Sequence, residues 1–224
     1  MSGLKEYLKE RNESSILRTP MDLHGAEIKV QGEGNLSGPE LKFLFNKIKK
    51  MISPLALSHV KQIRVSTFPG MKKEDYKSYY KDGIMYLSSD VDYIEEMMMN
   101  FFHELAHSFE KPHYDKIYGD GLLEIEFRNK RQKLKNVISM HEGGMTPPFD
   151  FSQINYNKEL DNYLANTIGY DKLWQYCNGI FTNPYAATSL REYFASGFEN
   201  YVKGEAEILD RFCPMLYNKV KQFF

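Results

Sequence analysis

The sequence has few cysteines and no long apolar or basic run, and these absences exclude several classes of protein. Cys177 and Cys213 are the two cysteines among 224 residues, and no CxxC pair occurs, so we expect free thiols and no disulfide framework. No stretch approaches the roughly 20 apolar residues that a membrane span needs. The 29 basic residues nearly balance the 30 acidic ones. We therefore expect neither nucleic acid nor a membrane surface as a partner.

The beginning of the chain, MSGLKEYLKERNES, is charged and lacks the apolar core of a secretory signal. We accordingly expect no signal peptide and no transmembrane segment. The expected location is the cytoplasm, or a larger particle such as a virion. Hydrophobic residues make up 42% of the chain, which is a globular composition that can bury a substantial core.

The order of the predicted elements indicates an α+β fold. Capping signals and apolar periodicity predict helices at 3–11, 39–51, 120–140, 157–177, 189–203 and 205–223. Ser37 and Glu40 form the capping pattern at the start of the second of these helices. A further helix follows Asp92, which can cap it with Glu95 three residues later, and Pro112 ends it. Short β-like runs predict strands at 61–68 and 83–90, after a loop or hairpin at 18–36. A small sheet thus precedes a mostly helical C-terminal half. We divide the chain into a helical and loop region of unknown role at 1–60 and a main domain at 61–224.

The segment NFFHELAHSFEKPH, Asn100 to His113, contains three of the six histidines. His103 and His107 are four residues apart, so a helix places them on one face, where two neutral imidazoles can bind one zinc ion. Glu104 stands between them and can act as general base on a water that the ion activates. Because the pattern sits in the middle of an apolar helix, we interpret it as a metal site and not as a chance match.

Several residues compete to be the third ligand. His113 has the spacing of the metzincin motif HExxHxxGxxH, and Met145 could form the Met-turn of that class. However, Glu110 stands where the motif needs a glycine to turn the chain. Glu124 and Glu126 follow at a distance seen in some zincins, although a solvated or salt-bridged helix face explains them equally well.

The last candidate, Glu192, lies in NPYAATSLREYFASGFENY, residues 183–201. Its REYFASGF resembles the third-ligand helix of the catalytic domain of anthrax lethal factor and its relatives, which include the Pro-Pro endopeptidases. In that family a glutamate, followed by two aromatic residues and an alanine, supplies the last zinc ligand, and a tyrosine seven residues earlier points to the substrate oxyanion. The resemblance implies Glu192 as ligand and Tyr185 as oxyanion donor. Alternatively, Ser189 to Glu192 is a capping box and Tyr185 an ordinary packed tyrosine.

The motif and the resemblance together imply a zincin-like, zinc-dependent endopeptidase acting on a peptide or protein substrate. His103, His107 and Glu192 would hold Zn²⁺, with Glu104 as general base and Tyr185 as oxyanion donor. The alternative is a catalytically idle zincin-like module with a structural or interaction role in a bacterial or phage particle. The intact glutamate between the histidines argues against that alternative, because a site that only binds metal does not need it.

Two further expectations concern the surroundings of the site. The strand GIMYLSS, 83–89, is expected to be the edge strand that binds substrate as an added antiparallel strand. The separation between His107 and Glu192 is longer than in compact members of the family. We therefore interpret residues 120–150 as an inserted helix and loop.

Overall fold

The computed structural model describes residues 21–31, 34–68, 70–71, 76–144 and 146–224. The helix predicted at 3–11 and the candidate Met-turn residue Met145 lie outside these ranges. The fold is α+β, as predicted. Contacts between Cα atoms divide the chain into two compact units, Met1–Ser108 and Phe109–Phe224.

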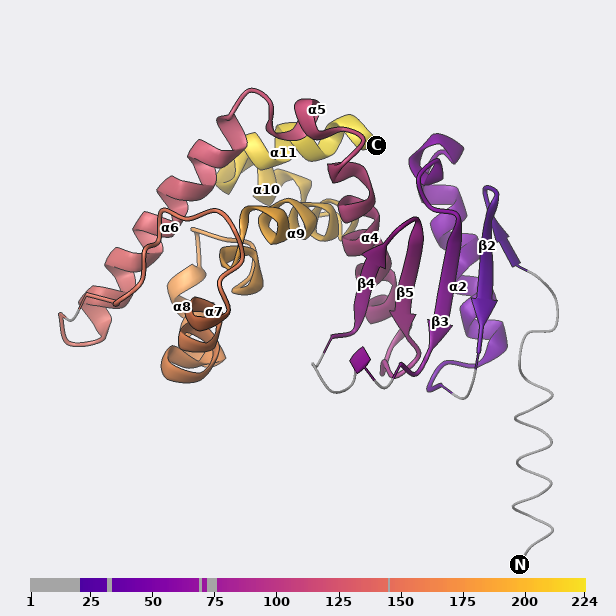
Figure 1. The fold of residues 1–224 in the computed structure, drawn as a ribbon, viewed down its shortest axis with the longest axis horizontal. Coiled ribbons are helices and arrows are strands. Elements are labelled where there is room, and N and C mark those ends of the chain that lie inside the picture. Colours follow the sequence, from indigo (N-terminus) through magenta and orange to yellow (C-terminus); the bar gives the residue numbers. More distant parts are fainter. Residues whose placement is uncertain (1–20, 32–33, 69, 72–75, 145) are drawn as a thin grey trace, which may run out of the picture. The chain divides into compact units, whose positions relative to one another are not determined.

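A mixed five-stranded sheet forms the basis of the first unit, in the order β1-β2-β3-β5-β4 (Figure 1). Its strands are β1 (Met21–Leu23), β2 (Ala26–Val30), β3 (Gln62–Ser66), β4 (Ser78–Lys81) and β5 (Ile84–Ser88). The β1–β2 and β4–β5 pairs are antiparallel, whereas β2, β3 and β5 run parallel. The hairpin expected within 18–36 is therefore present, and strands from both sides of residue 60 belong to one sheet.

The strand β5 is internal, which corrects the prediction that residues 83–89 form the sheet edge. Met85 lies opposite Ile63 of β3 on one side and opposite Tyr80 of β4 on the other, so the edge strand is β4. The prediction fails because the Lys- and Tyr-rich segment before β5 resembles a turn. Its tyrosines in fact favour a strand, and the tight turn is made by Asp82 and Gly83, whose φ angles are 53° and 84°.

One face of the sheet is apolar and covered by helices. Ile63, Val65, Met85 and Leu87 alternate along β3 and β5 and are completely buried. In Figure 1, α2 (Gly38–Met51) and α4 (Ile94–Glu110) lie on the same side of the sheet. This alternation is typical of a sheet with one face in the core.

The helix α4 carries the histidine motif and is buried, as predicted. Met97, Phe101 and Phe102 have no exposed surface. The start of the helix differs from expectation, because Glu96, and not the Glu95 expected from its spacing to Asp92, accepts a hydrogen bond of 3.1 Å from the backbone N–H of Asp92. The boundary between the two units falls inside this helix.

The second unit is helical. Its elements are α5 (Tyr114–Tyr118), α6 (Leu122–His141), α7 (Lys158–Asn162), the π-helical segment η2 (Tyr163–Gly169), α8 (Tyr170–Cys177), the 3₁₀ turn η3 (Tyr185–Ala187), α9 (Leu190–Val202), α10 (Ala206–Phe212), α11 (Pro214–Val220) and η4 (Lys221–Phe223). Two predicted helices are broken. The helix at 157–177 is interrupted where Gly169 has a φ of 86°, and that at 205–223 is interrupted before Pro214.

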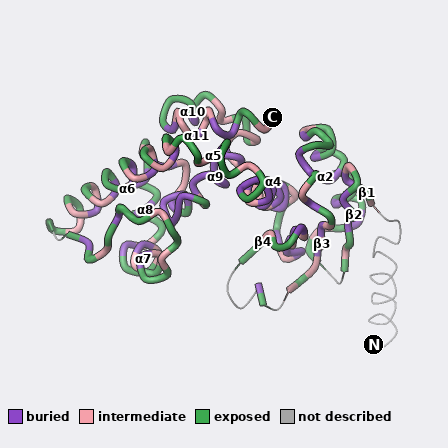
Figure 2. The backbone as a smooth tube through the Cα atoms, turned by 45° about the horizontal axis from the view of Figure 1, so that its top comes forward, coloured by how far each residue is buried: buried purple, intermediate pink, exposed green. Residues whose placement is uncertain are grey.

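An aromatic cluster forms the core around α9, which is purple along much of its length in Figure 2. Phe194 and Phe198 are fully buried, and their ring centroids lie 5.2 Å apart. Phe109, near the end of α4, packs on Phe198 at 5.7 Å and stacks on Phe223 at 4.7 Å. The cluster therefore joins α9 to the last turn of α4.

Candidate metal centre

The two motif histidines point their ring nitrogens at each other from one face of α4. The Nε2 atoms of His103 and His107 lie 3.1 Å apart, and both residues are partly exposed. Two nitrogens bound to one tetrahedral zinc at about 2.0–2.1 Å lie about 3.3 Å apart. The observed separation therefore matches that of two imidazoles sharing an ion, although a hydrogen bond between the rings accounts for it equally well.

The glutamate between the histidines contacts the edge strand. Glu104 is 3% exposed, and its Oε1 accepts a hydrogen bond of 2.7 Å from the hydroxyl of Ser78. Ser78 is the first residue of β4. The carboxylate that could act as general base is thus directed toward the strand where an extended peptide could pair. This contact was not predicted from the sequence, because β4 itself was not predicted.

Glu192 lies in the first turn of α9. The hydroxyl of Ser189, the residue that caps the helix, accepts a hydrogen bond of 3.2 Å from the backbone N–H of Glu192. Ser189 therefore caps the helix, and this bond is one of the two that a capping box contains. A carboxylate in this position is also favoured by the positive end of the helix dipole.

Among the residues that the structure describes, His103, His107 and Glu192 form a group that could hold a metal ion. One potential ligand atom from each lies within 4.8 Å of the others. Two imidazoles and one carboxylate are a donor set that catalytic zinc sites use, with a fourth position left for water. The donor chemistry therefore fits zinc, and the assignment of the ion itself stays a prediction.

The other candidates for the third ligand are not part of this group. The ring of His113 packs edge-on against Phe109 and Phe223, with centroids 5.8 and 5.5 Å away. Glu124 is paired with Arg128, four residues further along α6, at 2.8 Å. The ion pair of Glu124 matches the salt-bridged helix face that was its alternative interpretation, whereas His113 packs among aromatic rings.

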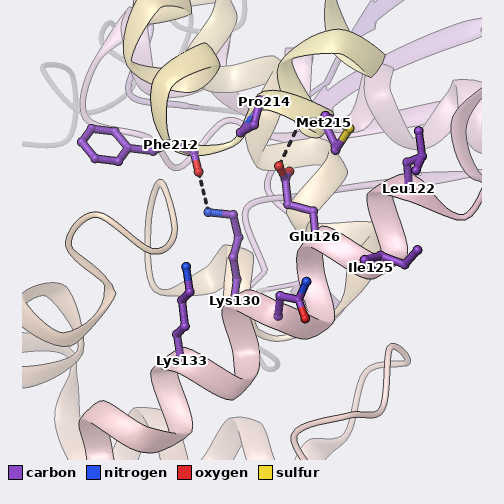
Figure 3. A pocket seen from close by; sticks show the side chains of 9 residues that line it. Leu122, Ile125, Glu126, Lys130, Lys133, Phe212, Pro214 and Met215 are labelled. Atoms are coloured by element: carbon purple, nitrogen blue, oxygen red, sulfur yellow. Dashed lines mark hydrogen bonds between the residues drawn. The ribbon is translucent and has the colours of Figure 1, made fainter.

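Glu126 holds the start of α11. Its carboxylate accepts hydrogen bonds from the backbone N–H of Met215 at 2.9 Å, from that of Leu216 at 3.1 Å and from the hydroxyl of Tyr193 at 2.8 Å. Figure 3 shows this side chain directed at Met215 in a pocket along α6, where Lys130 donates to the carbonyl of Phe212 at 2.7 Å. The acidic group is thus used to join helices.

Tyr185 opens the 3₁₀ turn η3 that leads into α9. Its backbone carbonyl accepts a hydrogen bond of 2.8 Å from the hydroxyl of Thr188, and the residue is 36% exposed. The predicted catalytic role of its phenol stays a prediction. His141, at the end of α6, stacks on Tyr176 with ring centroids 5.1 Å apart.

An ion pair that was not predicted from the sequence lies close in the chain to His107 and to Glu192. Glu110, the last residue of α4, accepts two hydrogen bonds from Arg191 of α9 and one from the hydroxyl of Tyr118. Burial and the adjacent Glu110 carboxylate raise the pKa of Tyr118 well above its usual range. The hydrogen bonds to Glu110 raise the pKa of Arg191. No short-range pattern relates positions 110 and 191, so the sequence carries no signal for this pair.

No protein-family model matches the chain, and no curated protein matches it either. Within the described ranges, no helix combines the length and the apolar character that crossing a bilayer requires.

Proposed function

We propose that this chain is a zinc-dependent endopeptidase with a zincin-like fold. The single observation that carries the proposal is the convergence of His103, His107 and Glu192, two of which belong to a His-Glu-x-x-His helix. Three protein ligands that leave a fourth position open are typical of catalytic zinc, whereas structural zinc sites are closed by four. We propose a location in the cytoplasm or in a larger particle such as a virion.

Glu104 and Tyr185 would have separate roles in peptide hydrolysis. When bound, zinc polarises the scissile carbonyl and lowers the pKa of water. Glu104 takes a proton from the attacking water and passes it to the leaving amine. Its burial beside Ser78 supports this role, since one carboxylate oxygen is held by the hydroxyl while the side chain stays shielded from solvent. Tyr185 would donate a hydrogen bond to the developing oxyanion.

The substrate would bind along β4. This strand is short, lies at the edge of the sheet and runs antiparallel to β5, so its outer backbone groups can pair with an extended peptide. The hydrogen bond from Ser78 to Glu104 joins that edge directly to the proposed general base. Main-chain pairing orients a peptide without demanding a particular side chain, so the proposal names the substrate class only as an extended peptide segment.

The experiment that tests the proposal compares wild type with Glu104→Gln. Elemental analysis of the purified protein measures zinc, and a mixed peptide library followed by mass spectrometry measures cleavage. We expect about one zinc per chain in both proteins. Cleavage should be lost in Glu104→Gln, because the amide cannot accept the proton from water.

The possible results separate the two functions. Zinc together with cleavage that depends on Glu104 supports the endopeptidase. Zinc without cleavage by wild type would favour the catalytically idle module. A protein that holds no zinc after metal loading would overturn both.

A further inference from the structure

We propose that the ion pair between Glu110 and Arg191 positions the third metal ligand. The proposal rests on the proposed function, because it concerns how the helix that carries Glu192 is held for binding metal. Glu110 follows His107 by three residues on α4, and Arg191 directly precedes Glu192 on α9. One interaction thus connects the neighbours of two ligands that are far apart in the sequence.

The pair has the geometry of a rigid connection. Oε2 of Glu110 accepts hydrogen bonds from Nε of Arg191 at 2.8 Å and from Nη2 at 2.6 Å. Oε1 of Glu110 accepts one from the Tyr118 hydroxyl at 2.7 Å. Both oxygens are therefore bound, and two donors of one planar guanidinium fix the direction as well as the distance.

Burial makes the pair hard to replace. The side chain of Glu110 is 9% exposed, whereas that of Arg191 is 65% exposed. A buried carboxylate that loses its partner is costly, so Glu110 holds the arginine firmly. Because the arginine keeps contact with water, forming the pair requires removing only one of the two charges from solvent. An exposed pair would contribute much less.

The position of Glu110 on α4 explains why the ion pair would influence the metal ligands. Residues three apart on a helix lie on the same face, so Glu110 projects from the same side of α4 as His107. The contact of Phe109 with Phe198 brings α9 to this turn of α4, and apolar contacts of this kind are not directional. The directional bonds to Arg191 restrict the rotation of the turn that also carries Glu192.

Position 110 is where this chain differs from the metzincin pattern. Where that motif has a glycine that turns the chain toward a third histidine, this chain has Glu110, which instead binds the helix that carries a glutamate. The residue that argues against His113 as ligand is thus the residue that would hold Glu192 in place.

The test measures zinc affinity in three variants by competition with a chromophoric chelator. The variants are Glu110→Gln, Arg191→Gln and the double variant. We expect each single variant to weaken zinc binding by about 10- to 100-fold, the range for groups that orient metal ligands. The double variant should lose no more than the worse single one, because the two residues act as a unit. Arg191→Lys, which keeps the charge but not the paired donors, should recover only part of the loss.

A matched control is Glu124→Gln, which breaks an ion pair of similar length with Arg128 on the exposed side of α6. It should leave zinc affinity unchanged. A second readout is the visible spectrum of the cobalt-substituted protein, which reports ligand geometry. It should change in Glu110→Gln and Arg191→Gln but not in the control. A pair that only stabilised the fold would lower the urea midpoint of the metal-free protein and leave the affinity and the spectrum unaltered.

The results distinguish this inference from the proposed function. If zinc binding by wild type depends on Glu192 but is unaffected in Glu110→Gln and Arg191→Gln, the positioning role is wrong and the metal centre stands. If wild type binds no zinc, both are wrong. Should Glu110→Gln fail to fold, the exposed Arg191 decides through its Gln and Lys variants, and unchanged affinity in both would overturn the proposal.

Discussion

Replacing Glu126 tests whether this residue joins helices, as its contacts indicate, while Glu192 supplies the proposed metal ligand. Glu126 was one of the candidates for the third ligand, yet its carboxylate accepts three hydrogen bonds from α9 and α11. We predict that Glu126→Ala destabilises the protein and leaves zinc affinity nearly intact. Glu192→Ala should do the reverse.

The magnitude follows from the three bonds. Tyr193 is completely buried, and leaving its hydroxyl without the carboxylate acceptor costs about 1–3 kcal/mol. Removing the acceptor of two backbone N–H groups at the start of α11 costs about 1 kcal/mol, as for the loss of an N-cap. We therefore expect Glu126→Ala to lower the free energy of unfolding by about 3 kcal/mol. Glu126→Gln keeps one acceptor oxygen and should cost about half as much.

The assay is urea unfolding of the metal-free protein, followed by tryptophan fluorescence from the single Trp, together with zinc competition on the same preparations. Glu124→Ala on the same helix is the control. The side chains of Arg128 and Glu124 are 41% and 37% exposed. We therefore expect the free energy of unfolding to change by less than about 1 kcal/mol. If Glu126→Ala kept its stability but lost zinc binding to the extent that Glu192→Ala does, the assignment of the ligands would be refuted.

Three other predictions test the site and the core. Glu192→Ala should weaken zinc binding far more than His113→Ala in the same competition assay; an equal loss, or a loss confined to His113→Ala, would favour the metzincin-type ligand set. Tyr185→Phe should retain zinc by elemental analysis but slow peptide turnover by about 100-fold, the effect of losing one oxyanion donor; unchanged turnover removes Tyr185 from the mechanism. Burial raises the pKa of Cys177 to about 12, so at about pH 8 its thiol should react with a disulfide reagent only after unfolding in urea. Rapid reaction in the folded protein would contradict its burial.

Local patterns in the sequence predicted much of the fold. The apolar periodicity of residues 94–109 and the proline at 112 predicted the buried helix α4, which ends at Glu110. Ser37 and Glu40 predicted the start of α2, where the Glu40 carboxylate accepts a hydrogen bond of 2.7 Å from the backbone N–H of Ser37. Such signals act within one or two helical turns, so they are present in the sequence itself.

The wrong predictions of the fold concern pairing between distant segments and the exact points where helices break. The sheet edge was assigned to β5 because the sequence of a single strand does not show which other strands pair with it. The single helices expected at 157–177 and 205–223 are interrupted near Gly169 and Pro214, although both residues are visible signals of a break.

The sequence by itself determined that His103 and His107 share one helical face with Glu104 between them, because a spacing of four residues is a property of any α-helix. It determined Glu192 only as one candidate among several. In the tertiary structure Glu192, and not His113, Glu124 or Glu126, lies with the histidines in a group that could hold a metal, and its role as ligand stays a prediction. The tertiary structure also decided that Glu110 binds Arg191. Both results depend on how α9 packs against the end of α4, and such long-range packing arises from the whole core and not from spacing along the chain.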